Sequence, residues 1–450
     1  MSNIDIPNFS TAQLDGLDEK TLSNTRGNQD HVGEYLSSIL EAGRLAMTGD
    51  TLTYLEDELH DAVDHNGKEL RTRSHTPASA SGRQVTGKAA VIRAQSRAGS
   101  GVPVPVFLPH SCIWVVLLPP SENRMLDLWR SLVNDKITLG RYTYGAIFSA
   151  TSIVTVRKLV DFCLEHVEAT SVILKDTNLA LLDVIKVSDL GMLFNGMGVA
   201  MYPRGIEYSS PCIVDPSTCS HVTKGKLNIE TLVKYTNKFP EHIKPVLASS
   251  GANTVTLEQV KLAQAELAPT GMYTMTEEVE DMEPVLTDIY FDVPSLRTAI
   301  ALGEKWVNGV RDSVLASLNL EAPADEEEWS ERNLHITRAG KASYLRQYGA
   351  WVTKVDMYEG GIVEDNTDDI ADVLTALSSS DSAREQMIKF CEDYIKKSAR
   401  AVVGIATHEC PGCHRSPDAK GNGVIALDPV RLFFKFLSLK VGRISARSLT

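Results

Sequence analysis

Two pairs of cysteines, far apart in the chain, are the residues whose type and spacing are best suited to chemistry. Cys212 and Cys219 lie in PCIVDPSTCSHVTKGKL, and Cys410 and Cys413 lie in THECPGCHRSPDAKGNG. Each pair has Pro and Gly nearby and is followed by a polar turn and a short apolar run. Two such cysteine knuckles supply four thiolates, which is the ligand set of a tetrahedral structural zinc site. The sequence therefore predicts that these four cysteines bind one Zn²⁺, with no other cofactor.

The spacing of the first pair leaves the ligand set open. Six residues separate Cys212 from Cys219, whereas about two to four separate most paired zinc ligands. Imidazole nitrogens also bind zinc, so His221, His408 and His414 are alternative ligands. Thiols without any ligand are the remaining interpretation of these cysteines.

The second pair also matches motifs of other chemistry. C-x-x-C-H is the attachment pattern of a c-type haem, but such proteins are exported, and MSNIDIPNFSTAQLDGLDEK at the N-terminus is acidic and polar rather than a secretory signal. A thioredoxin-like C-x-x-C opens a helix, whereas Pro417 and a Gly-rich turn follow Cys413. A metalloprotease needs H-E-x-x-H, and no second His follows His408-Glu409 at that spacing. Zinc is therefore preferred over haem, redox and protease chemistry.

Length and composition exclude several classes of protein. A chain of 450 residues is too long for one ordinary core, so about two to four domains are expected. The net charge is 45 − 58 = −13, which argues against broad nucleic-acid binding. The sequence contains no run of about eighteen apolar residues, so we expect no membrane span. Seven cysteines in a chain without an export signal indicate reduced thiols and a metal site rather than disulfides.

We expect an α+β multidomain fold with a small α/β domain, a split zinc ribbon, and a mostly helical insertion between the two cysteine knuckles. Residues 1–101 are expected to form an N-terminal arm with one helix and a basic flexible linker, and residues 102–208 an α+β domain. Residues 209–250 would form the first half of the ribbon and 251–403 the helical insertion. Residues 404–450 would form its second half and a basic C-terminal strand.

Local patterns give some elements of this plan. The run 113–118 is short and apolar and ends at two prolines, which predicts a buried strand. Residues 155–168 repeat apolar side chains at i, i+3 and i+4, which predicts a helix. The Gly-rich run 191–205 matches neither a phosphate loop nor a dinucleotide fingerprint, and we interpret it as a close-packed turn. Thr256 and Gln259 form a capping box that opens a helix.

Two basic segments occur in this acidic chain. After a helix near 31–47, residues 71–97 carry six Lys and Arg, and no acidic residue occurs between Glu69 and Glu122. Their richness in Ser, Ala and Gly is typical of a solvated linker. The alternative is an arm that becomes ordered against an acidic partner. The tail after Asp428 has five positive charges and no acid, and the alternation of its Leu and Phe residues predicts a docking strand.

No pattern in the sequence indicates catalysis. The Asp, Glu and His residues fall into no recognisable acid/base, nucleophile or phosphate-loop arrangement. A zinc ion with four thiolate ligands has no open coordination position for substrate. The sequence therefore favours a structural or assembly role over an enzyme.

Three stretches resemble virion proteins of large contractile-tailed bacteriophages. They are LPHSCIWVVLLPPSENRMLDLWRSL, FNGMGVAMYPRGIEYSSPCIVDPSTCSHVTKGKLNIETLVKY and HECPGCHRSPDAKGNGVIALDPVRLFFKF. Over about residues 102–450 the chain is similar to the baseplate hub and hub-assembly family of T-even-type phages, which carries a cysteine-knuckle zinc site. By this resemblance Cys212, Cys219, Cys410 and Cys413 become the zinc ligands.

The resemblance implies a non-enzymatic virion component of the tail, a baseplate hub or wedge subunit assembled in the host cytoplasm. Its partners would be other tail and baseplate proteins and copies of itself, with no small-molecule substrate, no nucleic acid and no membrane span. The alternatives are a tail-assembly chaperone absent from the mature particle, a metal-dependent hydrolase, and a capsid or internal head protein. An open coordination position or a bound water on the metal would favour the hydrolase.

Overall fold

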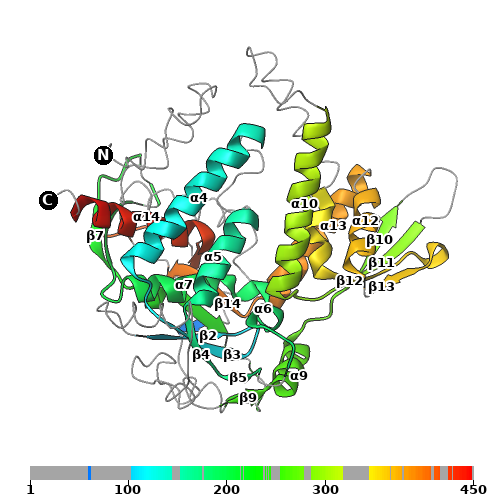
Figure 1. The fold of residues 1–450 in the computed structure, drawn as a ribbon, viewed down its shortest axis with the longest axis horizontal. Coiled ribbons are helices and arrows are strands. Elements are labelled where there is room, and N and C mark those ends of the chain that lie inside the picture. Colours follow the sequence, from blue (N-terminus) through cyan, green and yellow to red (C-terminus); the bar gives the residue numbers. More distant parts are fainter. Residues whose placement is uncertain are drawn as a thin grey trace.

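The computed structural model describes residues 59–61 and most of residues 103–447. Within the second span it does not describe residues 144–152, 175–176, 213, 216, 237–238, 240, 242, 245–253, 278–284, 318–343, 365, 378–379, 407–409, 416–423 and 428. The helix expected near 31–47 and the basic segment 71–97 lie outside the described residues. The described part is a mixed α/β structure (Figure 1).

A three-stranded antiparallel sheet lies under the helices of the first hydrophobic core (Figure 1). Every residue of its first two strands is buried, as the apolar run 113–118 predicted. The strands, in order across the sheet, are β2 (Val104–Leu108), β3 (Ile113–Leu117) and β4 (Val167–Thr170). The helices of this core include α4 (Glu122–Thr143), α5 (Ile153–Glu165), α7 (Leu190–Met201) and α14 (Pro429–Arg447).

Helix α7 is the centre of the first core. Ten consecutive residues of this helix are buried. Gly196 lies against a valine of β2, and Gly198 lies against a phenylalanine ring of α14. A Cβ atom at either position would come within 3.0 Å of that side chain. The two glycines therefore allow the sheet and α14 to pack directly on the backbone of α7.

Two sequence predictions are wrong in this core. The Gly-rich run 191–205 forms most of α7 rather than a turn, because burial along the whole helix outweighs the low helix propensity of glycine. The tail after Asp428 forms helix α14 rather than a C-terminal strand. Proline is favoured at the first position of a helix, and the apolar residues of the tail recur at helical spacing. Those buried in α14 are Val430, Leu432, Phe433, Phe436, Leu437 and Val441.

A second antiparallel sheet joins distant parts of the chain. Its order is β1-β8-β14-β15, so a strand near residue 235 pairs directly with a strand near residue 403. The bounds of these strands are β1 (Leu59–Asp61), β8 (Val233–Thr236), β14 (Ala401–Ala406) and β15 (Val424–Ala426).

Shorter elements connect these layers. Thr256 caps α9 as predicted, because its side-chain oxygen accepts from the Gln259 N–H (3.2 Å) and the Gln259 side chain accepts from the Thr256 N–H (2.9 Å). β6 and β7 form an antiparallel hairpin, and β5 and β9 form a short parallel pair. The elements are β5 (Val172–Ile173), α6 (Leu181–Val184), η3 (Val187–Asp189), β6 (Ile206–Pro211), β7 (Val222–Leu227), η4 (Ile229–Leu232), β9 (Val255–Thr256) and α9 (Leu257–Leu267).

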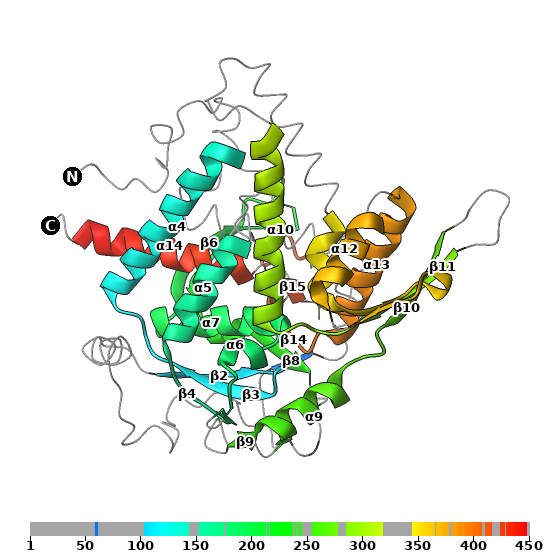
Figure 2. The ribbon, with the colours of Figure 1, turned by 45° about the vertical axis from the view of Figure 1, so that its right-hand side comes forward.

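The expected helical insertion contains a four-stranded antiparallel sheet and a second hydrophobic core (Figure 2). Most of the described residues of this insertion are helical, but its sheet was not expected because the period-two pattern of its strands was missed: exposed and less exposed residues alternate along β10. The strands, in sheet order, are β10 (Met272–Glu277), β11 (Val285–Phe291), β12 (Val352–Asp356) and β13 (Ile362–Glu364). The helices are α10 (Leu296–Ser317), η5 (Tyr344–Trp351), η6 (Tyr358–Gly360), α12 (Thr367–Leu377) and α13 (Asp381–Ser398).

No helix among the described residues combines the length and the apolar character that crossing a bilayer requires.

The packing of α7 predicts a large effect from a very small substitution. In Gly196→Ala the new Cβ would lie 2.2 Å from a methyl group of Val106, a stiff β-branched residue in the buried sheet. We expect a loss of about 1–3 kcal/mol of stability from overpacking. In the control Gly191→Ala, the nearest atom is 3.3 Å away, on Val403, and we expect little change. Thermal unfolding of the two variants measures the difference, and equal stabilities would contradict this account of α7.

Candidate metal centre

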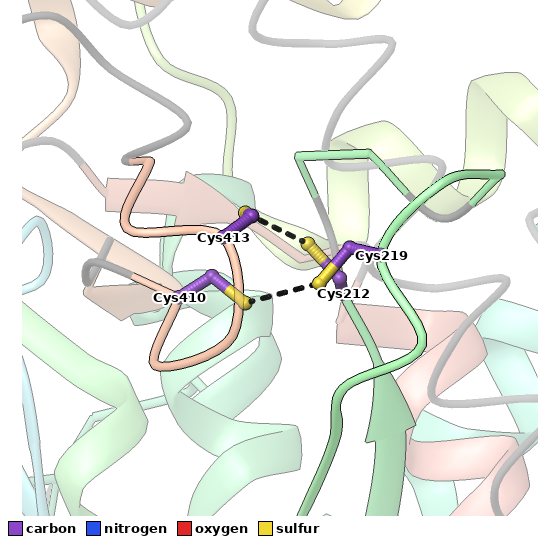
Figure 3. Close-up of side chains that lie close together, drawn as sticks. All are labelled: Cys212, Cys219, Cys410 and Cys413. Carbon is purple, nitrogen blue, oxygen red and sulfur yellow. Dashed lines mark hydrogen bonds between the residues drawn. The ribbon is translucent and has the colours of Figure 1, made fainter.

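Two hairpins carry the four cysteines. The β6–β7 ladder ends at the pair Pro211 and Val222, so Cys212 and Cys219 lie in the loop that joins these strands. The β14–β15 ladder ends at residues 406 and 424, and the loop between them carries Cys410 and Cys413. Figure 3 shows the two loops facing each other with the four sulfur atoms between them. The structure therefore brings together all four cysteines that the sequence predicted as ligands.

The sulfur spacing fits a single tetrahedral ion. The Sγ atoms of Cys212 and Cys413 are 3.7 Å apart, and those of Cys219 and Cys410 are 3.8 Å apart. All four lie within 4.8 Å of one another. An ion with four Zn–S bonds of about 2.3 Å separates its sulfurs by about 3.8 Å, whereas a disulfide requires about 2.05 Å. The cluster has the dimensions of a metal site and not of two disulfides.

Backbone N–H groups point at sulfur atoms of the first loop. The N–H of Asp215 donates to Sγ of Cys212 (3.4 Å), and the carbonyl of Asp215 accepts from the N–H of Cys219 (2.9 Å). The N–H of His221 favours the thiolate of Cys219, although burial and the neighbouring sulfurs outweigh it and raise the pKa of Cys219. The loop thus folds around its two sulfurs in a tight turn.

The second loop stabilises one thiolate strongly. The N–H groups of Cys413 and Gly412 lower the pKa of Cys410 to about 6. The N–H of Arg415 favours the Cys413 thiolate, but burial and the sulfurs of Cys212 and Cys410 outweigh it and raise the pKa of Cys413 to about 11. Four thiolates at this spacing therefore repel one another unless a cation lies between them. A divalent ion supplies that charge, and its binding displaces the thiol protons.

A glycine permits the close approach of the two loops. A Cβ atom at Gly412 would lie 2.4 Å from Cβ of His221 and 3.1 Å from Sγ of Cys219. No side chain fits there without moving the first loop. Cys212 and Cys410 are buried, with 4% and 6% of their surface exposed, and their partners are half-buried. The protein thus buries two of the four cysteines and partly covers the other two.

Two of the three histidines proposed as alternative ligands, His221 and His414, do not join this cluster. Within the described residues, the only group of acidic, cysteine and histidine side chains close enough to hold an ion is the four cysteines. His221 and His414 flank it, and His408 lies outside the described residues. The other three cysteines are buried elsewhere, and burial raises the pKa of each thiol: Cys112, Cys163 and Cys391.

A buried Ser, His and Asp also meet, a cluster that the sequence did not predict. Asp189 accepts hydrogen bonds from the N–H groups of His110 (3.1 Å) and Ser111 (2.7 Å) and from both of their side chains. The second ring nitrogen of His110 accepts from the N–H of Arg400 (2.9 Å). The serine is thus bonded to the carboxylate, and the imidazole has no free nitrogen to act as its base. These residues, up to 79 positions apart, anchor the β2–β3 turn and are not a catalytic triad.

Comparisons with known proteins find no relative of this chain. No family model, no curated protein and no solved structure matches the chain.

The cluster predicts a defined metal stoichiometry. We expect about one metal ion per chain by elemental analysis, and we expect a chelator to increase the number of reactive thiols by about four. Cys413→Ser removes a ligand and should abolish stoichiometric binding. The control Cys163→Ala changes a thiol of the first core and should keep the ion. Metal-free protein with all seven thiols reactive would contradict the assignment.

The loop contact at Gly412 predicts a position where the ligands stay in place but the site weakens. In Gly412→Ala the new methyl group pushes the first loop away from the second. We expect metal affinity to fall about 10–100-fold, the range seen when residues that orient metal ligands are changed. Competition with a chromogenic chelator measures the affinity. Wild-type affinity in this variant would show that the close approach of the loops is unimportant.

Proposed function

We propose that this chain is a non-enzymatic structural subunit of a contractile phage tail, most closely a baseplate hub or wedge protein, folded around one structural Zn²⁺. The single observation that carries the proposal is the set of four sulfurs, drawn from two hairpins and spaced for one tetrahedral ion. The tail assignment draws its support from the sequence resemblance described above. As in the sequence analysis, Cys212, Cys219, Cys410 and Cys413 are the ligands.

The chemistry of the donors supports zinc. Four thiolates in tetrahedral geometry select zinc or iron over the hard cations that prefer oxygen ligands. Elemental analysis separates these two metals. Zinc in such a site has no redox chemistry of its own and stabilises folded structure.

The closed ligand set supports a structural role over hydrolysis. A catalytic zinc keeps one position for water or substrate, whereas the four cysteines here could fill all four positions of a tetrahedral ion. The Ser–His–Asp cluster lacks a free base, as described above. Neither the four-cysteine cluster nor the Ser–His–Asp cluster therefore provides the nucleophile that a metal-dependent hydrolase would need.

The metal also pins the two ends of the insertion. Cys212 and Cys410 are 410 − 212 = 198 positions apart, and closing so long a loop costs a few kcal/mol because the entropy cost grows only logarithmically with length. Structural zinc binding in small peptides is worth about 10–16 kcal/mol. One ion is therefore sufficient to hold the two loops together.

The proposal predicts that the protein is a stoichiometric part of purified phage particles. Quantitative mass spectrometry of virions and of isolated tails should find it in both, at a constant ratio to the other tail proteins. Its presence in infected cells and absence from the particle would instead identify an assembly chaperone. A head location would identify a capsid or internal head protein.

A variant tests whether the zinc serves assembly. Cys410→Ser should lower the thermal midpoint of the protein and reduce its incorporation into tails, because the two loops separate. Cys391→Ala, which alters a buried thiol of the second core, is the matched control and should be incorporated normally. Full incorporation of a metal-free Cys410→Ser protein would remove the structural role of the ion.

A further inference from the structure

The β10 edge of the four-stranded sheet is closed by a side chain. The N–H of Thr276 donates to Oε1 of Gln386 (3.1 Å), and Nε2 of Gln386 donates to the carbonyl of Thr276 (2.9 Å). Gln386 belongs to α13, so a helix side chain takes the place of a neighbouring strand. Unpaired strand edges attract other chains, and native proteins cover them by such means.

The opposite edge, β13, leaves its backbone groups open. In the β12–β13 hairpin, the N–H of Met357 donates to the carbonyl of Gly361 (3.0 Å), and the register places Val363 opposite Val355. Hydrogen-bonded pairs alternate along an antiparallel ladder. Val363 therefore bonds to β12, and the residues on either side of it direct their N–H and C=O groups outward. Among the residues that the structure describes, no strand pairs with this side of β13.

The same alternation rule is correct at the closed edge. The N–H of Phe291 donates to the carbonyl of Gly271 (2.8 Å), so every second residue from Gly271 bonds to β11. The rule then directs the backbone of Thr276 outward, where Gln386 meets it. The two edges thus differ in what covers them and not in how they are built.

The open edge has a distinct chemistry. The outward backbone groups belong to Ile362, whose side chain is 55% exposed, and to Glu364, which is exposed. Tyr358 lies in the preceding turn and is 59% exposed, and its hydroxyl donates to Asp288 of β11 (3.1 Å). The sequence 355–383 contains eight Asp and Glu and no Lys or Arg, and two lysines from outside it lie nearby: Lys354 of β12 pairs with Glu364 in the ladder, and Lys305 contacts Asp368. An extended segment that is basic and carries small or β-branched residues fits this edge.

One segment of the chain has that composition. Residues 83–97, RQVTGKAAVIRAQSR, carry four Lys and Arg, no acid, and the β-branched pair Val91-Ile92. We propose that residues 83–97 of a second copy of this chain add to the outer edge of β13 as a short strand. Backbone hydrogen bonds set the geometry of the contact, and the opposite charges make it selective for this partner.

The position of the edge favours a second copy over the same chain. Ile92 is 104 − 92 = 12 residues before Val104, the first residue of β2, and twelve residues reach at most about 43 Å. Val104 pairs with Leu117, shortly before α4 begins. Figure 1 places β13 on the other side of the molecule from the start of α4. This inference rests on strand geometry and charge and not on the proposed tail function.

A synthetic peptide tests the contact. A fluorescein-labelled peptide of residues 83–97 is titrated with the full-length, metal-loaded protein, and fluorescence anisotropy is recorded at several salt concentrations. We expect saturable binding that weakens as salt rises, because charge contributes to it. The same peptide with Val91→Pro keeps its charge but cannot pair as a strand, and we expect about tenfold weaker binding, equivalent to about 1.4 kcal/mol.

Variants of the edge locate the binding site. Ile362→Pro removes an outward N–H that no bond inside the sheet uses, so the fold should persist while the peptide binds about tenfold more weakly. Ile362→Val keeps both the N–H and the branched side chain and should bind as wild type. Glu364→Lys keeps the backbone and reverses the charge. We expect its loss of affinity relative to wild type to be larger at low salt than at high salt.

Three results would overturn the proposal: no saturable binding by the peptide, equal binding of the Val91→Pro peptide, or unchanged binding by Ile362→Pro and Glu364→Lys proteins whose circular dichroism and metal content match wild type. If Ile362→Pro does not fold, Glu364→Lys decides. Failure here leaves the virion measurement untouched, and absence from virions leaves the peptide measurement untouched.

Discussion

The pairing of β14 with β8 is the contact on which both the first core and the metal centre depend. It sets Val403 opposite Val233, which is 170 positions earlier, and both side chains are buried. The cysteine loop of β6–β7 comes shortly before β8, and the other cysteine loop comes shortly after β14. One ladder therefore determines where both loops lie. It also delivers the chain into α14, which packs against α7.

A metal ion held by the four cysteines would add to a connection that the backbone has already made. The ladder and the hydrogen bond from Arg400 to His110 hold the start of β14 without any ion. The two loops themselves are different, because apart from Ile213, Val214 and Ala419 their sequences consist of cysteine, proline, glycine and polar residues, with little apolar surface to bury. Their N–H groups stabilise one thiolate well, but the close sulfurs oppose further ionisation. An ion bound by the four cysteines would complete this local structure, and it would contribute less energy than in a zinc finger that has no other core.

Sequence reasoning succeeded where the signal was local or chemical. The four cysteines were identified because few roles suit such pairs, and the capping box at Thr256 was identified because three positions contain all of it. The same reasoning failed at α7, because a Gly-rich run predicts a turn unless the side chains that pack against Gly196 and Gly198 are known.

The four-stranded sheet was missed for a related reason. A strand of five to seven residues gives a weaker pattern than a long helix, and its partners lie far away in the sequence. The cluster around Asp189 gave no signal in the sequence, because its members are up to 79 positions apart and only the packing of the first core brings them within hydrogen-bonding distance. What the sequence does not carry locally is therefore the long-range pairing that burial selects.

An arm that binds the edge of a neighbouring copy has a consequence for symmetry. The two surfaces in such a contact differ, since a basic segment of one copy meets an acidic strand edge of the next. Each copy then offers one segment and one edge, so the contact is heterologous and repeats from copy to copy. Contacts of this kind close into rings when the rotation between copies divides a full turn, and otherwise they extend into filaments. The charge separation within this chain, basic at residues 71–97 and acidic around β13, is thus suited to building a ring or a filament without any two-fold interface.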